Sequence, residues 1–244
     1  MTIEELITHP DKVFWPDEGY SKIHLARYYD AIFPKLRPYV DDRLLSLERC
    51  PDGMLGNCFY QKAAPKGLPK GTPTHRIQHQ NREVEYVVGG LKDTELALVN
   101  LGCIPVHVWA SRASHPQQPD WMVFDLDPTS GKFADAAKAG LVVKDELDRL
   151  GLTSFPKTSG SRGLHVFVPL RLGPTYDEVL PFANRAYRLP LVAFGDKYLH
   201  IGESMVYEDR LPQPLTNGFC HVVMKVVELG PARQTARDLS RGRT

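Results

Sequence analysis

The hydrophobic positions of this chain alternate between helical and strand spacing. Apolar side chains at intervals of three and four residues after Ser21 predict a helix that Ser21 caps and that ends near Pro34. The same spacing predicts a helix that begins at Asp93 or Thr94, and a longer one that Gly151 ends. Short β-prone segments predict strands over residues 44–47, 58–61, 83–88, 106–109, 121–127 and 165–168, and residues 62–74 predict a loop. The order of elements predicts an α/β (α+β) fold.

The strand over residues 121–127 carries two acidic side chains on one face. Side chains alternate along a strand, so Asp125 and Asp127 share a face with Val123. The opposite face, which suits a core, carries Met122, Phe124 and Leu126. The two carboxylates lie roughly 6–7 Å apart along the strand. They are therefore candidate ligands for Mg²⁺ or Mn²⁺, which take carboxylate oxygens. The alternative is a strand-end turn without a metal.

A turn rich in glycine and serine, residues 158–164, follows one helix later and leads into the next strand through His165. We expect free backbone N–H groups at this turn to point at phosphate oxygens, with Arg162 and His165 as further donors. The expected N–H donors are Ser159, Gly160, Ser161 and Gly163. A turn without function and a structural histidine are the alternatives. Carboxylates next to a phosphate-binding turn indicate nucleotidyl transfer.

Composition limits the function only loosely. The chain has 244 residues and a formal net charge of +1, so binding to nucleic acid would need a local basic patch. One candidate patch, which could equally serve solubility, consists of Lys62, Lys66, Lys70, His75 and Arg76. We expect no membrane span and no secretory signal. We expect four reduced thiols at Cys50, Cys58, Cys103 and Cys220, and therefore a cytoplasmic location.

From about Leu6 to about Arg188, the chain resembles the polymerase domain of bacterial DNA ligase D, a member of the archaeo-eukaryotic primase superfamily. The resemblance depends on residues 8–16, 19–22, 28–29, 49–53, 59–62, 124–128 and 157–170. It implies a primase-polymerase-like fold with a central mixed or antiparallel sheet flanked by helices. It also implies one domain over residues 1–188, followed by an atypical tail over residues 189–244.

The resemblance assigns roles to particular residues. It implies that Asp125 and Asp127 bind the catalytic metal, and that Ser159, Arg162 and His165 contact the incoming nucleotide, together with the rest of their turn. It further implies a grip on a DNA 5′-phosphate and a stacking position for template bases. The phosphate residues are Lys12, Lys22 and His9, which stands where the family usually has Asn, and the stacking residues are Phe59 and Tyr60. The alternatives are solvated lysines and a core phenylalanine.

The chain departs from the family in its last segment. The superfamily supplies a third metal carboxylate on a later strand, for which Asp209 is the best candidate here and Glu228 the second. We hypothesise that the tail is translated out of the ancestral frame. A tail that did not evolve with this fold would pack poorly.

Three functions compete. The first is a template-dependent nucleotidyltransferase that uses Mn²⁺ or Mg²⁺ and a nucleoside triphosphate to fill gaps or extend ends in non-homologous end joining. The second is a non-catalytic DNA-end-binding module, and the third is an unrelated metal-dependent phosphohydrolase. The expected partners are DNA with gaps or double-strand breaks, a separate ATP-dependent ligase and a Ku-like end-binding protein. The ligase is expected on another chain because no KxDG motif is present.

Overall fold

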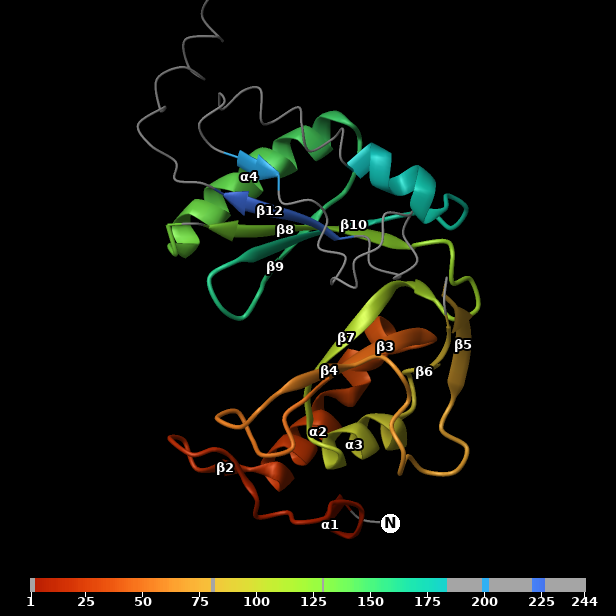
Figure 1. The fold of residues 1–244 in the computed structure, drawn as a ribbon. Helices are drawn as coiled ribbons and strands as arrows, with labels where there is room; N and C mark the ends of the chain where they lie inside the picture. Colours follow the sequence, from red (N-terminus) through yellow and green to blue (C-terminus); the bar gives the residue numbers. More distant parts are fainter. Residues whose placement is uncertain (1–2, 80–81, 129, 184–198, 202–220, 227–244) are drawn as a thin grey trace, which may run out of the picture. The chain divides into compact units, whose positions relative to one another are not determined.

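The chain divides into two units, residues 1–116 and 117–244. The computed structural model describes residues 3–79, 82–128, 130–183, 199–201 and 221–226 (Figure 1). Helices and sheets with antiparallel strand pairs occur in both units, so the predicted mixed α/β class is confirmed. The expected domain boundary near residue 188 lies outside the described residues. No helix in the described part of the chain is long and apolar enough to cross a bilayer.

The first unit builds a three-stranded antiparallel sheet in the order β4-β3-β7. Two short antiparallel pairs, β1 with β2 and β5 with β6, complete its strands. Its helices are α1 (Ile3–Leu6), α2 (Lys22–Val40) and α3 (Lys92–Asn100), and its strands are β1 (Val13–Trp15), β2 (Tyr20–Ser21), β3 (Arg43–Arg49), β4 (Phe59–Gln61), β5 (Thr74–Gln78), β6 (Glu83–Val87) and β7 (Cys103–Arg112). Strand β5 begins where the pattern predicted only loop, because its alternating polar residues pair with β6.

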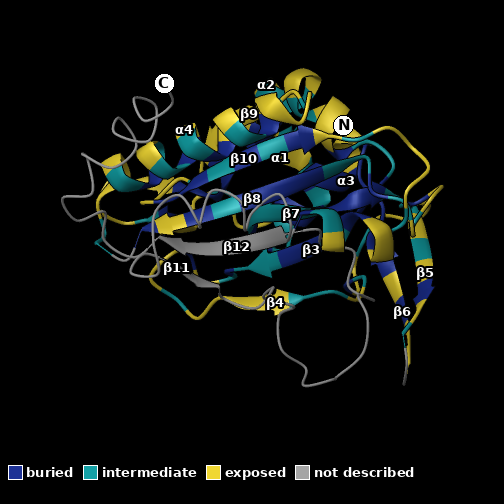
Figure 2. Ribbon diagram, turned by 90° about the horizontal axis from the view of Figure 1, so that it is seen from above, coloured by how far each residue is buried: buried dark blue, intermediate teal, exposed yellow. Residues whose placement is uncertain are grey.

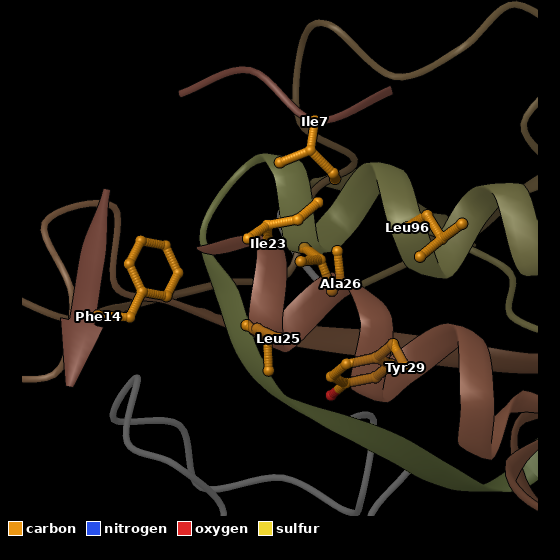
Figure 3. Packing of buried hydrophobic residues seen from close by; sticks show 8 residues of the cluster. Ile7, Phe14, Ile23, Leu25, Ala26, Tyr29 and Leu96 are labelled. Carbon is orange, nitrogen blue, oxygen red and sulfur yellow. The ribbon is translucent and has the colours of Figure 1, made fainter. Parts of the chain in front are cut away.

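Helices α2 and α3 pack together over an apolar cluster that also takes in α1 and β1 (Figure 3). Ile23, Ala26 and Tyr29 of α2 meet Leu96 of α3 and Phe14 of β1 in this cluster. These five residues are 9% exposed or less. This packing fixes the start of α2 beside the segment that precedes it. The position of Lys12 and Lys22 depends on that arrangement.

The predicted cap of α2 is confirmed, and its predicted end is wrong. The backbone N–H of Ser21 donates to Nδ1 of His24 at 3.0 Å, which completes a capping box. The helix passes Pro34 and Pro38 and ends at Val40. Both prolines are exposed and lie four residues apart, on one face of the helix. The carbonyls that lose their partners can therefore bond to water, which makes the prolines tolerable.

The expectation of four reduced thiols is wrong for Cys50 and Cys58, which form a disulfide. The register of the β3–β4 hairpin explains the pairing. Arg49 and Phe59 are cross-strand partners, so the next residue outward on each strand is a cysteine, and the two face one another. Cys103 is a free, buried thiol, and burial raises its pKa to about 12. Cys220 lies outside the described residues.

The second unit is a mixed five-stranded sheet in the order β11-β12-β8-β10-β9. Strand β12 runs parallel to β8, whereas β10 is antiparallel to both β8 and β9. The elements are β8 (Trp121–Pro128), α4 (Phe133–Arg149), β9 (Phe155–Thr158), β10 (Leu164–Pro169), β11 (Leu199–Ile201) and β12 (His221–Val226), and residues 176–183 are helical. The predicted end of α4 is confirmed, since Gly151 follows it with φ of 71°.

Helix α4 covers the apolar face of β8 and β10, and its Gly140 sits against the side chain of Leu164. Met122, Phe124 and Leu126 of β8 are at most 1% exposed. In Figure 2 these two strands appear mainly buried, whereas α4 carries many exposed residues. The alternation that predicted a core face of β8 is confirmed. It leaves the acidic face of the strand pointing away from α4.

Glu95 is a buried acid in the first unit. Its residue is 1% exposed, and its carboxylate lies close to the backbone of Gly89. Burial raises the pKa of Glu95 to about 7, and the nearby backbone of Gly90 partly opposes the shift. The native protein therefore keeps a proton that the unfolded chain releases at lower pH.

Replacing Glu95 with Gln should stabilise the protein more at about pH 8 than at about pH 4.5. Below its unfolded pKa of about 4.3, Glu95 is neutral in both states. As pH rises towards the native value of about 7, the wild-type protein loses stability, and above it the loss is complete. The amide cannot ionise, so the gain should reach roughly 2–3 kcal/mol. Urea unfolding at both pH values measures it.

Glu18→Gln, on the exposed surface, is the control. It should change the unfolding free energy little at either pH. A gain from Glu95→Gln that is equal at both pH values would contradict the assignment.

Candidate functional site

The pairing of β8 with β10 places an acid and a histidine opposite each other. Asp125 and His165 are cross-strand partners in the antiparallel register. Nε2 of His165 lies 3.3 Å from Oδ1 of Asp125, and the side chains are 21% and 20% exposed. Both side chains therefore project from the face opposite α4, partly open to solvent. The imidazole can hold the carboxylate in place or donate to a ligand beside it.

Asp127 reaches the glycine-rich turn. A Cβ added to Gly163 would lie 2.7 Å from Oδ1 of Asp127 and 3.1 Å from Oγ of Ser159. A side chain at position 163 would displace the Asp127 carboxylate and crowd the Ser159 hydroxyl. The second carboxylate, the turn and its hydroxyl therefore lie close together, in a region that the glycine at position 163 keeps open.

The turn is held by its own hydrogen bonds. Oγ of Ser159 accepts from the backbone N–H of Gly163 at 3.0 Å and of Ser161 at 3.4 Å. The N–H of Ser159 donates to the carbonyl of Gly163 at 3.1 Å. The prediction of free N–H donors is therefore wrong for these three residues. The reason is that a serine side chain competes for neighbouring backbone donors in a tight turn.

Two further residues of the turn are exposed. Gly160 adopts φ of 91°, which favours glycine. Arg162 is exposed, and its Nη1 would lie 3.1 Å from a Cβ added to Gly131, in the segment that joins β8 to α4. The guanidinium thus lies beside the chain that leaves the acidic strand, where it can meet an anion.

Asp125 and Asp127 suit a hard divalent cation. Both offer carboxylate oxygens, the ligands that Mn²⁺ and Mg²⁺ prefer, and Gly163 keeps the space beside Asp127 free of a side chain. The two other acids considered from the sequence, Asp209 and Glu228, lie outside the described residues. Strand β12 runs beside β8, with Lys225 at the register position opposite Asp127.

A second set of predicted residues lies in the first unit. Nζ of Lys12 forms an ion pair with Oδ1 of Asp52 at 2.7 Å, with the lysine side chain 38% exposed. Lys22 is 6% exposed, so the alternative of a solvated surface lysine is wrong for it. Its Nζ donates to the carbonyl of Thr8 at 2.9 Å and to Oδ1 of Asn100 at 3.2 Å. Burial, and after it the charge of Lys12, lowers the pKa of Lys22.

His9 lies at the edge of a cavity beside Lys12. His9, Pro10, Asp11 and Lys12 line a cavity of about 620 Å³. His9 is exposed and has φ of 51°, a left-handed conformation that is uncommon for a residue with a side chain. The backbone N–H of Lys22 donates to the carbonyl of Lys12 at 2.8 Å, which ties the start of α2 to this segment. The structure therefore brings His9, Lys12 and Lys22 together.

Phe59 and Tyr60 are exposed by 45% and 50%, so the alternative of core packing is wrong for Phe59. They are adjacent on β4 and point to opposite faces of its sheet. Arg49 lies over the ring of Phe59 at 5.4 Å, and the ring of Tyr60 lies 5.6 Å from that of His107. Each ring offers an exposed surface on which a base could stack.

Sequence reasoning missed the partners of the two lysines. Asp52 pairs with Lys12, and it stands in a segment, residues 49–53, that already carried the family resemblance. Asn100 holds Lys22 and also accepts from the N–H and hydroxyl of Thr8, both at 2.9 Å. No signal in the sequence pointed to Asn100, because the contact joins positions far apart in the chain.

Comparisons with known proteins agree on one family. Residues 21–189 match the family described as LigD, primase-polymerase domain. The chain is 35% identical over 194 residues to the multifunctional non-homologous end joining protein LigD of Pseudomonas aeruginosa, and 29% identical over 179 residues to the bifunctional LigD of Bacillus subtilis. These matches cover 73% and 72% of this chain. The chain spans 21% and 28% of those relatives' lengths.

A solved structure shares the fold. The polymerase domain of Mycobacterium tuberculosis ligase D in complex with DNA matches with a TM-score of 0.72 and 23% identity. The match covers 90% of this chain and 76% of that one. It bears on the fold alone at this level of identity.

Replacing Ser159 with Ala should lower the free energy of unfolding by about 1 kcal/mol. The change removes the acceptor for two backbone N–H groups of the turn. Ser161→Ala, at an exposed neighbour, is the matched control and should be nearly neutral. Urea denaturation measures both variants. Equal effects would show that the Ser159 hydroxyl does not hold the turn.

Proposed function

Because the chain belongs to the LigD primase-polymerase domain family, we propose that it is a template-dependent nucleotidyltransferase that fills gaps or extends ends during non-homologous end joining. The observation that supports this most is the meeting of Asp127 with the Ser159–Gly163 turn, next to the Asp125–His165 pair. Nucleotidyl transfer needs a metal-binding acid pair beside a site for the triphosphate.

Each residue of this region has a task in the proposed reaction. Asp125 and Asp127 would hold Mn²⁺ or Mg²⁺, which would promote attack of a 3′-hydroxyl on the α-phosphate and neutralise the leaving pyrophosphate. His165 either orients Asp125 or donates to the triphosphate, since a neutral imidazole carries a single N–H. Ser159 keeps its hydroxyl hydrogen as a donor, because its oxygen accepts the turn's N–H groups. Arg162 adds a charged donor for phosphate oxygens.

The first unit supplies the proposed contacts to DNA. Lys12, Lys22 and His9 bind the 5′-phosphate at a gap or break, since His9 and Lys12 line one cavity and the charge of Lys12 is close enough to Lys22 to lower its pKa. Phe59 and Tyr60 offer exposed rings for template bases. A phosphate at Lys12 has to replace the carboxylate of Asp52, so the two anions compete for one cation.

A non-catalytic DNA-end-binding module is the second candidate. Strand β12, which runs parallel beside β8, has the sequence HVVMKV and carries no acid that could join Asp125 and Asp127. Asp209 is our best candidate for a third ligand. Without a third carboxylate, the metal site would be weaker, while the phosphate-binding residues would be unaffected.

The family also suggests partners. We propose that an ATP-dependent ligase seals the ends that this chain fills, and that a Ku-like protein brings it to double-strand breaks in the cytoplasm, at the nucleoid. The relatives carry non-homologous end joining in their names, and this chain spans about a fifth of the Pseudomonas protein, 21%.

Replacing both Asp125 and Asp127 with Ala should reduce primer extension at least about 100-fold on a gapped duplex with Mn²⁺, because the metal loses its ligands. Binding to the same DNA should persist, since the phosphate residues lie in the other unit. Extension is followed on denaturing gels with ribonucleotides and deoxyribonucleotides, and binding by fluorescence anisotropy.

Asp145→Ala, on the exposed surface of α4, is the matched control and should extend normally. No extension by the wild-type chain with any nucleotide or metal would reject the enzyme and favour the end-binding module. Extension that survives the double replacement would reject the assigned metal site.

Replacing Lys12 with Ala should weaken binding to a 5′-phosphorylated gap roughly threefold to tenfold and leave binding to a 5′-hydroxyl gap unchanged. Asp52→Asn should act in the opposite direction, because it removes the competing carboxylate. Lys35→Ala, an exposed lysine of α2, is the control for general loss of charge. Equal losses on both DNAs from Lys12→Ala would contradict the phosphate assignment.

A further inference from the structure

The disulfide closes a loop that touches the proposed 5′-phosphate site. We call residues 50–58 the clasp loop; it joins β3 to β4, and its two ends are Cys50 and Cys58. The loop carries Asp52, the carboxylate that pairs with Lys12 at 2.7 Å. It ends where β4 begins, at Phe59. The disulfide thus closes a loop that contains Asp52, the partner of Lys12, and that leads directly into Phe59, a proposed stacking residue.

The Cys50 end of the clasp loop is firmly attached. The N–H of Cys50 donates to the carbonyl of Gly102 at 2.7 Å, and the N–H of Met54 donates to the carbonyl of Phe14 at 2.9 Å. Gly53 is packed against the backbone of Phe14, where an added Cβ would lie 3.0 Å from its Cα. Toward Cys58 the loop is mostly exposed. The disulfide is therefore a direct link between the exposed end and the attached end.

The two sulfurs differ in access. Cys50 is 1% exposed, whereas Cys58 is exposed. A reagent in solution therefore meets Cys58 before the buried Cys50, which is left as the second thiol. A reactive exposed cysteine beside a resolving one is the arrangement of reversible redox sites.

We propose that Cys50 and Cys58 form a reversible oxidation site that controls binding of the DNA 5′-phosphate. Hydrogen peroxide is the oxidant: the Cys58 thiol loses its proton, and the thiolate attacks one peroxide oxygen to form a sulfenic acid. The hydroxide that leaves takes up that proton and becomes water. Cys50 then displaces the hydroxyl group as a second water, leaving the disulfide, so two thiols and one peroxide yield one disulfide and two waters. A small-molecule thiol reverses this by attacking Cys58, with Cys50 as the leaving thiolate, and a second thiol completes its own disulfide.

The bond should weaken end binding. In the oxidised loop, both ends are fixed, and Asp52 stays against Lys12. Reduction removes the covalent link between Cys50 and the exposed segment that ends at Cys58. Gly56 of that segment lies against Asp52, where an added Cβ would be 2.8 Å from the Cβ of Asp52. Loosening this segment gives the loop conformations in which the carboxylate is farther from the lysine. Lys12 then has less competition for a phosphate. The inference rests on the proposed function for its readout, which is binding of a 5′-phosphorylated gap.

The side chains around the two sulfurs suggest that a metal ion can bind to the reduced form. Glu48, Cys50 and Cys58 offer ligand atoms within 4.8 Å of one another, and Nε2 of His107 lies 3.4 Å from Oε2 of Glu48. Reduced thiols with a carboxylate and an imidazole nearby suit Zn²⁺. A bound zinc would hold the loop closed without the disulfide, so the test must measure zinc.

The experiment compares wild-type protein reduced with a dithiol and oxidised with hydrogen peroxide. Thiol alkylation and mass spectrometry report the Cys50–Cys58 bond, and anisotropy reports binding to 5′-phosphate and 5′-hydroxyl gaps. The reduced form should bind the phosphorylated gap roughly threefold to tenfold more tightly, with no difference on the hydroxyl gap. The Cys50→Ser/Cys58→Ser variant should bind like the reduced protein after either treatment.

Asp52→Asn is the decisive variant. It keeps both cysteines and should still form the disulfide, but the redox difference in binding should disappear, because no carboxylate competes for Lys12. A redox difference that persists in Asp52→Asn overturns the proposed coupling. A second result also overturns it: the reduced wild-type chain binds one zinc, the double serine variant binds none, and end binding is equal in both redox states.

The outcomes separate this inference from the proposed function. A preference for the 5′-phosphate that is equal in the reduced and oxidised proteins overturns the redox control and leaves end binding intact. No preference for the 5′-phosphate in either state overturns end binding, and the redox control with it.

Discussion

The antiparallel pairing of β8 with β10 is the constraint on which the proposed chemistry depends. It sets Asp125 opposite His165, and it turns the apolar sides of both strands towards α4. The same register brings the start of β10, and so the serine-bearing turn, to Asp127 at the end of β8. A shift of one residue would put the acids against the helix and the apolar residues in solvent. Burial of the apolar face therefore fixes the orientation of the polar one.

Much of this region was predictable from the sequence because its signals are local. Alternation along β8 assigned the acidic and the apolar faces correctly. His165 could be picked out as a candidate because it directly follows the turn, and the structure places it beside Asp125. The hydrogen bonds that occupy the backbone N–H groups of the turn were not predictable. Ser159 itself takes the hydrogen bonds of Ser161 and Gly163, and this depends on a turn geometry that spacing does not specify.

Contacts between distant parts of the chain were the main source of error. Lys22 looked like a surface residue, but the packing of α2 against α3 buries it beside Asn100. The disulfide depends on the register of the β3–β4 hairpin, which scattered cysteine spacing could not reveal. The length of α2 depended on which face its prolines occupy. Each of these results from tertiary placement overriding a local preference.

The buried ammonium group of Lys22 has a consequence for how an anion could meet it. An ammonium group has three hydrogens, and two of them are directed to the carbonyl of Thr8 and the amide oxygen of Asn100. One hydrogen remains, so a phosphate would receive a single, directed bond there, whereas the more exposed Lys12 can rotate to follow its ligand. Lys22 would then fix the position of the DNA end, and Lys12 would adapt to it.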